Sequence, residues 1–218
     1  MPDSITPLAL VLGIVGATWG VVSDRLATLW PEHEEGVEPR GLDWRTVACA
    51  AIGGLAMAAL PSRYGDPAQL ALFAAWFLTL TTLLATDLDQ RLLPDVITLP
   101  LIPLAAIAAL TGIDPLPRDA FGLVGAVAVA VLIPLGMYLL SIPFGEGAIG
   151  GGDLKLLVSV GLLSGLVRTI TGVVAGAFAA GIVIFLLLVG RRITLKSFIP
   201  FGPFLVLGAF WAVLVRFG

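Results

Sequence analysis

Two aspartates stand at the borders of apolar runs in this chain, where chemistry explains them better than packing does. Asp87 directly follows the apolar run 67–86, and Asp153 follows consecutive glycines and opens a later apolar run. An ionised side chain just inside a membrane is costly, so function is the default interpretation of such a residue. Two carboxylates in one poorly hydrated site cannot both ionise at low cost, and they therefore share a proton. One then activates water as a general base while the other protonates a leaving amine, as in an aspartic protease.

Other interpretations of the same residues stay open at this point. A membrane carrier coupled to protons or cations uses carboxylates of the same kind. Asp153 is also suited to capping a helix start, with Lys155 extending toward the lipid headgroups or favouring the ionised form of one carboxylate. The glycine run 150–152 makes the backbone flexible. We therefore expect an unwound segment there, at which another chain can approach Asp153 closely.

A turn with further charged residues follows the first aspartate. Pro94 disfavours a helical conformation at the residue before it, so the turn is expected at Leu93, with a new helix starting near Pro94. In that arrangement Asp95 is a carboxylate at a helix N-terminus, which is a structural role. Asp89 and Arg91 are expected to face solvent.

Membrane helices are the elements that must position these carboxylates. Of the 218 residues, 58% are hydrophobic and only 12% are charged, and the mean hydropathy is +1.04. Soluble domains carry about 25% charged residues, and runs of about 20 apolar residues indicate transmembrane helices. The sequence therefore predicts an all-α, polytopic membrane helix bundle of about eight (seven to eight) transmembrane helices. The apolar runs are 5–23, 46–60, 67–86, 92–111, 121–143, 154–167, 169–189 and 198–215.

Positively charged residues indicate how this bundle is oriented. If the N-terminus lies outside and every run crosses the membrane, the inner loops hold eight Lys or Arg residues and the outer side holds four. An excess of Lys and Arg is typical of cytoplasmic loops. This orientation places the polar stretches 24–45, 87–95 and 145–153 on the cytoplasmic side. We expect a multi-pass protein of the lipid bilayer with its N-terminus outside.

The remaining polar residues do not indicate a metal site or a nucleic-acid partner. His33 lies between Glu32 and Glu34, but adjacent residues on a helix do not share a face, and a solvated acidic loop is the favoured interpretation. Cys49 is the single cysteine, which excludes an intrachain disulfide or a cysteine-rich zinc site. We interpret it as a small buried residue. The chain has no basic stripe of the kind that binds nucleic acid.

Three motifs, taken together, resemble those of one known family. The first, at 87–100, reads DLDQRLLPDVITLP and resembles the aspartate motif of type IV prepilin peptidases, the leader peptidases of pili and type II secretion. The second, at 145–165, reads GEGAIGGGDLKLLVSVGLLSG and contains the family's G-x-G-D-x-K pattern. The third, at 199–205, reads IPFGPFL and resembles the closing motif. These blocks have the family's order and cover most of residues 70–215.

The resemblance implies an intramembrane aspartic endopeptidase of the GxGD type. Asp87 and Asp153 correspond to the catalytic pair, and no metal or cofactor is implied for the cleavage. The segment 201–203 is expected to pack near them. Supporting positions implied by the motifs are Gly150, Gly152, Lys155, Glu146, Asp89 and Asp95.

A type IV prepilin or pseudopilin is the substrate that the resemblance implies. Such a substrate has a basic leader, a glycine just before the cleaved bond, and then a hydrophobic helix. Cleavage is expected on the cytoplasmic side of the bacterial cytoplasmic (inner) membrane. We divide the chain into N-terminal membrane helices, 1–66, with a short loop at 24–45, and a catalytic membrane domain, 67–218.

The N-terminal part resembles the family less closely. Gly16, Arg25 and Leu26 fit the family pattern, but Gly20 stands where the family usually has asparagine. Many members carry paired C-x-x-C motifs that bind zinc on the first cytoplasmic loop, and they also N-methylate the trimmed pilin with S-adenosylmethionine. This chain has no such motif because Cys49 is its single cysteine. Peptidase activity without zinc is therefore predicted, and methyltransferase activity is not expected.

Overall fold

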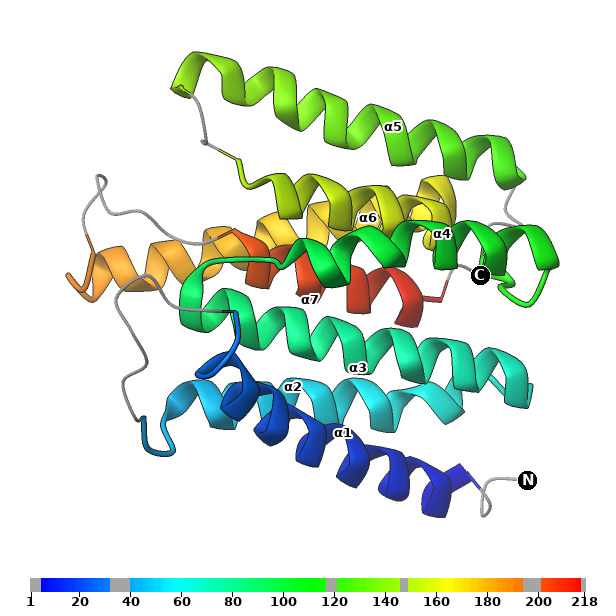
Figure 1. The fold of residues 1–218 in the computed structure, drawn as a ribbon, viewed down its shortest axis with the longest axis horizontal. Helices are drawn as coiled ribbons and strands as arrows, with labels where there is room; N and C mark the ends of the chain where they lie inside the picture. The colour runs from blue at the N-terminus through cyan, green and yellow to red at the C-terminus, as the bar shows by residue number, and fades with distance from the viewer. Residues whose placement is uncertain (1–4, 32–39, 117–120, 146–148, 194–200, 217–218) are drawn as a thin grey trace.

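The apolar runs of the sequence form the helices of the structure. The computed structural model describes residues 5–31, 40–116, 121–145, 149–193 and 201–216. Over these residues the chain forms α-helices, two short 3-10 turns and no strand, so the all-α prediction is confirmed. The helices are α1 (Ile5–Ala27), α2 (Trp44–Ala59), α3 (Pro67–Gln90), α4 (Asp95–Thr111), α5 (Gly122–Ser141), α6 (Gly151–Val189) and α7 (Gly202–Leu214), and the 3-10 turns are Leu60–Ser62 and Ile142–Phe144 (Figure 1).

Short polar side chains begin two of these helices. The Asp43 carboxylate caps α2 by accepting the backbone N–H groups of Arg45 and Thr46. Desolvation opposes ionisation of Asp43, but these hydrogen bonds outweigh it and lower the pKa of the carboxyl. Asp66 caps α3 in the same way, and Pro67 occupies the first helical position.

The outer surface of the bundle is apolar, as expected for a protein surrounded by lipid. Among the described residues, five helical segments are long and apolar enough to cross a membrane, and α4 and α7 are shorter apolar helices. Large hydrophobic side chains point outward, among them Leu10, Val124 and Phe178, with 65%, 81% and 72% of their surface exposed. A soluble protein rarely exposes so much contiguous apolar surface. The described residues form seven α-helices. The predicted number of eight transmembrane helices is therefore not confirmed.

The longest helix, α6, contains both of the segments expected at 154–167 and 169–189. The break lies at Gly165, with φ 75° and ψ 179°, and not at Arg168 as the apolar runs suggested. Thr169 Oγ1 lies 3.4 Å from the carbonyl oxygen of Val160, whereas nine residues of straight helix span roughly 13 Å. The chain therefore turns back at Gly165, and the two parts of α6 run in opposite directions (Figure 1).

Small residues allow the helices on either side of this break to approach closely. Gly161 lies against the backbone of Ala130 on α5 in the first part of α6. Gly172, in the second part, lies against the backbone of Gly208 on α7. Close backbone contact through small residues is typical of helix pairs in membranes. α6 therefore links α5 to α7.

α3 is the central helix, and its end positions the first aspartate. It packs against α1, α2 and α7, and Phe73, Phe77 and Leu80 on it are fully buried. Both chain termini lie at one end of the bundle, and the α3–α4 turn lies at the other (Figure 1). The turn follows the prediction, because Pro94 is the N-cap of α4 and Asp95 is its first residue.

Candidate active site

Asp87 lies in the last turn of α3 and is nearly inaccessible, with 4% of its surface exposed. The helix ends where Arg91 adopts a left-handed conformation, with φ 56°, and its N–H donates to the Asp87 carbonyl oxygen at 2.9 Å. Oδ2 of Asp87 has no hydrogen-bond partner within the described part of the chain. A buried carboxylate oxygen without a partner is unusual in a structural residue.

Asp153 lies in the first turn of α6 and is half-buried. Its carboxylate lies close to Gly150, the N-cap residue, where a Cβ atom would be 3.3 Å from Oδ2 of Asp153. The helix already begins at Gly151, so the expectation of an unwound segment over all three glycines is wrong. The reason is that Gly151 and Gly152 continue the helical hydrogen-bond pattern, which leaves only Gly150 extended, with ψ 135°.

Gly152 brings the two carboxylates together. A Cβ atom on Gly152 would lie 2.5 Å from the carbonyl oxygen of Leu93 and 2.7 Å from its Cβ atom. Only glycine therefore lets the start of α6 touch the α3–α4 turn. This contact places the first turn of α6, which carries Asp153, against the turn that follows Asp87, so the two aspartates lie at the same end of the bundle.

A third element closes this site from the side of α7. A Cβ atom on Gly202 would lie 2.6 Å from Cγ and Oδ2 of Asp87 and 2.7 Å from Oδ1. The first turn of α7 thus lies directly against the carboxylate and presents the positive end of its helix dipole. The expectation that segment 201–203 packs near the aspartates is confirmed.

Lys155 and Asp95 form an ion pair at the edge of the site. Nζ of Lys155 donates to Oδ1 of Asp95 at 2.6 Å, and the side chains are 32% and 60% exposed. Lys155 therefore joins α6 to α4. This contact differs from both expectations, which were that Lys155 extends to the lipid headgroups or favours the ionised form of a catalytic carboxylate. Asp95 is the acidic residue in the first turn of α4, as predicted.

Asp89 faces the protein, and the expectation that it faces solvent is wrong. Its side chain is 9% exposed, and Oδ1 accepts from Arg45 at 2.7 Å and lies 3.4 Å from Arg40. The reason is that Arg40, just before α2, and Arg45, in the first turn of α2, reach across to the end of α3. Arg91, by contrast, is exposed as predicted.

The same arginines reach Asp24, a buried acid that the motifs did not single out. Asp24 lies in α1 and is 1% exposed. Its carboxylate pairs with Arg25 and Arg40 and accepts a hydrogen bond from Thr46. An acid directly after the first apolar run, 5–23, was the available signal. Residue 24 was expected to begin the loop after the first helix. The loop begins after Ala27 instead, because α1 ends there.

Three remaining expectations concern the residues at positions 33, 49 and 146. Glu146 lies outside the described residues, and so does His33. Cys49 is fully buried, and its backbone lies against Gly20, where a Cβ atom would clash with it. The described residues include no group of three or more potential metal ligands. The part of the chain described here therefore does not fit a cysteine-ligated zinc ion.

A known protein family matches the part of the chain that carries both aspartates. Residues 71–186 match the model of the type IV leader peptidase family. The chain belongs to this family. The matched segment contains both aspartates and the glycines that precede Asp153, whereas Gly202 and the arginines of the α1–α2 segment lie outside it.

Several curated proteins named prepilin leader peptidase/N-methyltransferase are similar to this member of the leader peptidase family. The Pseudomonas putida protein is 33% identical over 154 residues, which is 70% of this chain and 52% of the relative. The Burkholderia pseudomallei (strain 1026b) protein is 34% identical over 159 residues, or 72% and 50%. The Pseudomonas aeruginosa protein is 32% identical over 143 residues, or 66% and 48%.

These matches leave part of each relative without a counterpart. The chain spans about half the length of the curated relatives it matches. No solved structure matches this leader peptidase family member.

Proposed function

We propose that the chain is an aspartic endopeptidase that removes the leader peptide of type IV prepilins or pseudopilins, with Asp87 and Asp153 as its catalytic pair. The observation that carries this proposal is the joint site at the ends of α3 and α6. There the contact of Gly152 with Leu93 holds the start of α6, with Asp153, beside a buried Asp87 whose Oδ2 has no partner among the described residues. Membership in the type IV leader peptidase family supports the same reaction.

The proposed reaction needs one water molecule and no cofactor. The two carboxyl groups share one proton. The ionised carboxylate takes a proton from water, and the resulting hydroxide attacks the carbonyl carbon before the scissile bond. The protonated carboxyl group donates a hydrogen bond to the carbonyl oxygen and then protonates the leaving amine. The C–N bond breaks, and the products are the leader with a new carboxylate and the pilin with a new N-terminus.

The surroundings of the aspartates suit a substrate that is half leader and half membrane helix. The site lies at one end of an apolar bundle, so a hydrophobic helix can stay in lipid while a basic leader stays in water. Asp95 lies beside the site with its side chain 60% exposed, and a basic leader would compete with Lys155 for this carboxylate.

We further propose how the chain lies in the membrane. The two parts of α6 cross separately, so the chain crosses eight times, with the N-terminus outside and the aspartates at the cytoplasmic surface of the bacterial inner membrane. The excess of Lys and Arg in the loops at that end supports this orientation. Residues 67–218 form the catalytic unit, and the chain trims pilins without methylating them.

Co-expression with a candidate prepilin tests the peptidase proposal. Asp87→Asn and Asp153→Asn should each abolish the shortened pilin while the variant still accumulates in the membrane. Asp43→Asn is the matched control, because asparagine caps a helix about as well as aspartate and Asp43 lies at the same end of the bundle. Normal cleavage by either active-site variant contradicts the assignment. Mass spectrometry of the pilin N-terminus checks that no methyl group is added.

A further inference from the structure

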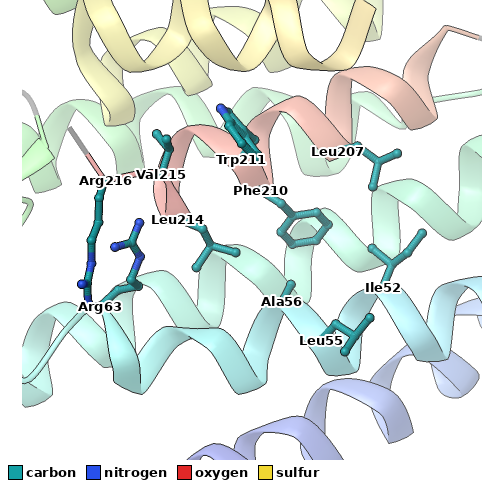
Figure 2. Close-up of a pocket in the computed structure, with 10 residues that line it drawn as sticks. All are labelled: Ile52, Leu55, Ala56, Arg63, Leu207, Phe210, Trp211, Leu214, Val215 and Arg216. Carbon is teal, nitrogen blue, oxygen red and sulfur yellow. The ribbon is translucent and has the colours of Figure 1, made fainter. Parts of the chain in front are cut away.

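A groove lies at the end of the bundle opposite to the aspartates. It is a cavity of about 580 Å³ between α2 and α7, which both pack against α3. This volume falls within the range of about 300–1,000 Å³ that is typical of small-molecule sites. Its walls are almost entirely apolar (Figure 2). The apolar lining residues are Ile52, Leu55 and Ala56 from α2 and Leu207, Phe210, Trp211 and Leu214 from α7.

Two arginines stand side by side at one end of this groove (Figure 2). Arg63 lies in the turn after α2, and Arg216 follows the end of α7 and donates to the carbonyl oxygen of Ser62 at 3.0 Å. Neither guanidinium has a carboxylate partner among the residues that the structure describes. Burial and the charge of Arg216 lower the pKa of Arg63. An anion between the two groups would relieve this repulsion.

A polar pocket of about 330 Å³ adjoins the same arginines. It is also lined by Arg168, which donates to the carbonyl oxygen of Val215 at 2.7 Å. The carboxylate of Asp114 is close to Tyr64 in this region and accepts the backbone N–H of Leu116. Among the described residues, the three guanidinium groups outnumber the carboxylates of Asp114 and Asp66.

The level of the arginines in the bundle favours a lipid over a soluble ligand. Arg63 directly follows the membrane-spanning segment Trp44–Ser62, and Arg216 lies just past the end of α7. Both guanidinium groups are thus at the border of the hydrocarbon region, where lipid phosphates lie. Trp211 is 50% exposed on the groove, and tryptophan is enriched at this border.

We propose that this groove binds an anionic phospholipid, with its phosphate on Arg63 and Arg216 and an acyl chain along α2 and α7. One guanidinium group can donate two parallel hydrogen bonds to the oxygens of a phosphate. Basic pockets between membrane helices bind anionic lipid headgroups. The apolar walls exclude a free anion as the full occupant, because a free phosphate leaves the groove unfilled. The site does not depend on the peptidase activity proposed above.

Native mass spectrometry of the full chain in detergent tests the site. Phosphatidylglycerol and phosphatidylcholine with the same acyl chains are added at equal concentrations, and inorganic phosphate is added as a competitor. We expect roughly tenfold stronger retention of phosphatidylglycerol, lost in the double variant Arg63→Gln/Arg216→Gln. The matched control is Arg191→Gln/Arg192→Gln, which removes two exposed arginines after α6. It should retain the lipid as the unmodified chain does.

Three results overturn the proposal. Equal retention of the two lipids would show that the site does not select for a negatively charged headgroup. Full retention by the Arg63→Gln/Arg216→Gln variant places the lipid elsewhere. Displacement of the lipid by millimolar inorganic phosphate indicates a simple anion site without use of the groove. Thermal unfolding with and without lipid separates these results from misfolding, because a bound ligand raises the unfolding temperature of a folded variant.

Discussion

Replacing Gly202 with alanine tests the contact between α7 and the Asp87 carboxylate. The added Cβ atom would lie 2.6 Å from Cγ and Oδ2 of Asp87, whereas ordinary contacts start at 3.4 Å. The carboxylate or the helix must therefore retreat by roughly 0.8 Å, and a shift of about 1 Å in a reacting group costs about 10²-fold in rate. We expect leader cleavage by Gly202→Ala to fall by roughly 10- to 100-fold.

Gly151→Ala is the matched control for this substitution. Gly151 and Gly202 are each the first residue of a helix, but a Cβ atom on Gly151 would meet nothing within 4 Å. Alanine is favoured over glycine within a helix by about 1 kcal/mol, so neither variant loses helix stability. The assay is the initial rate of leader removal from a purified prepilin by each variant in detergent, normalised to the amount of folded protein.

Two outcomes would refute this reasoning. Cleavage by Gly202→Ala at the rate of the unmodified chain would show that α7 does not constrain the carboxylate. An equal loss in Gly151→Ala would show that backbone flexibility, and not the contact with Asp87, is what cleavage requires.

Three further substitutions have defined outcomes. Gly152→Ala should slow cleavage as strongly as Gly202→Ala, because its Cβ atom would lie 2.5 Å from the carbonyl oxygen of Leu93; an unchanged rate contradicts the contact. Lys155→Met should lower the free energy of unfolding by less than about 1 kcal/mol, since the ion pair is largely exposed, and high salt should remove the difference. Tyr64→Phe should cost about 1 kcal/mol in thermal unfolding, because it removes a buried hydrogen bond of 2.6 Å; no change indicates that water replaces the bond.

Apolar runs were sufficient to predict where helices form, but they did not show where the chain reverses. The break in α6 was expected near Arg168 because a charge interrupts the apolar run there. It lies at Gly165 instead, where φ is 75°, a conformation that glycine adopts at little cost. Arg168 is tolerated inside the helix because it donates to the carbonyl oxygens of Ala212 and Val215 at the end of α7. Hydropathy cannot show such a pairing, because the partner lies on another helix.

The aspartates of the site could be found from the sequence, but the residues that hold them together could not. Asp87 and Asp153 stand out because a charge beside an apolar run is rare. The glycines matter for what lies opposite them: Gly152 faces Leu93, and Gly202 faces Asp87 itself. A glycine shows in a sequence only that a side chain is absent, and the structure shows which neighbour requires that absence.

The ion pairs beside the site explain why the α1–α2 segment matters to a turn on α3. Asp89 lies two residues after Asp87 and is held by Arg45 and Arg40. Arg40 also pairs with the fully buried Asp24 of α1. Removing one partner of a buried ion pair typically costs 3–5 kcal/mol, because the other charge is left without compensation. These ion pairs therefore attach the end of α3 to α1 and to the start of α2, and losing one charged partner would destabilise the others. This attachment keeps the Asp87 carboxylate in place against α7.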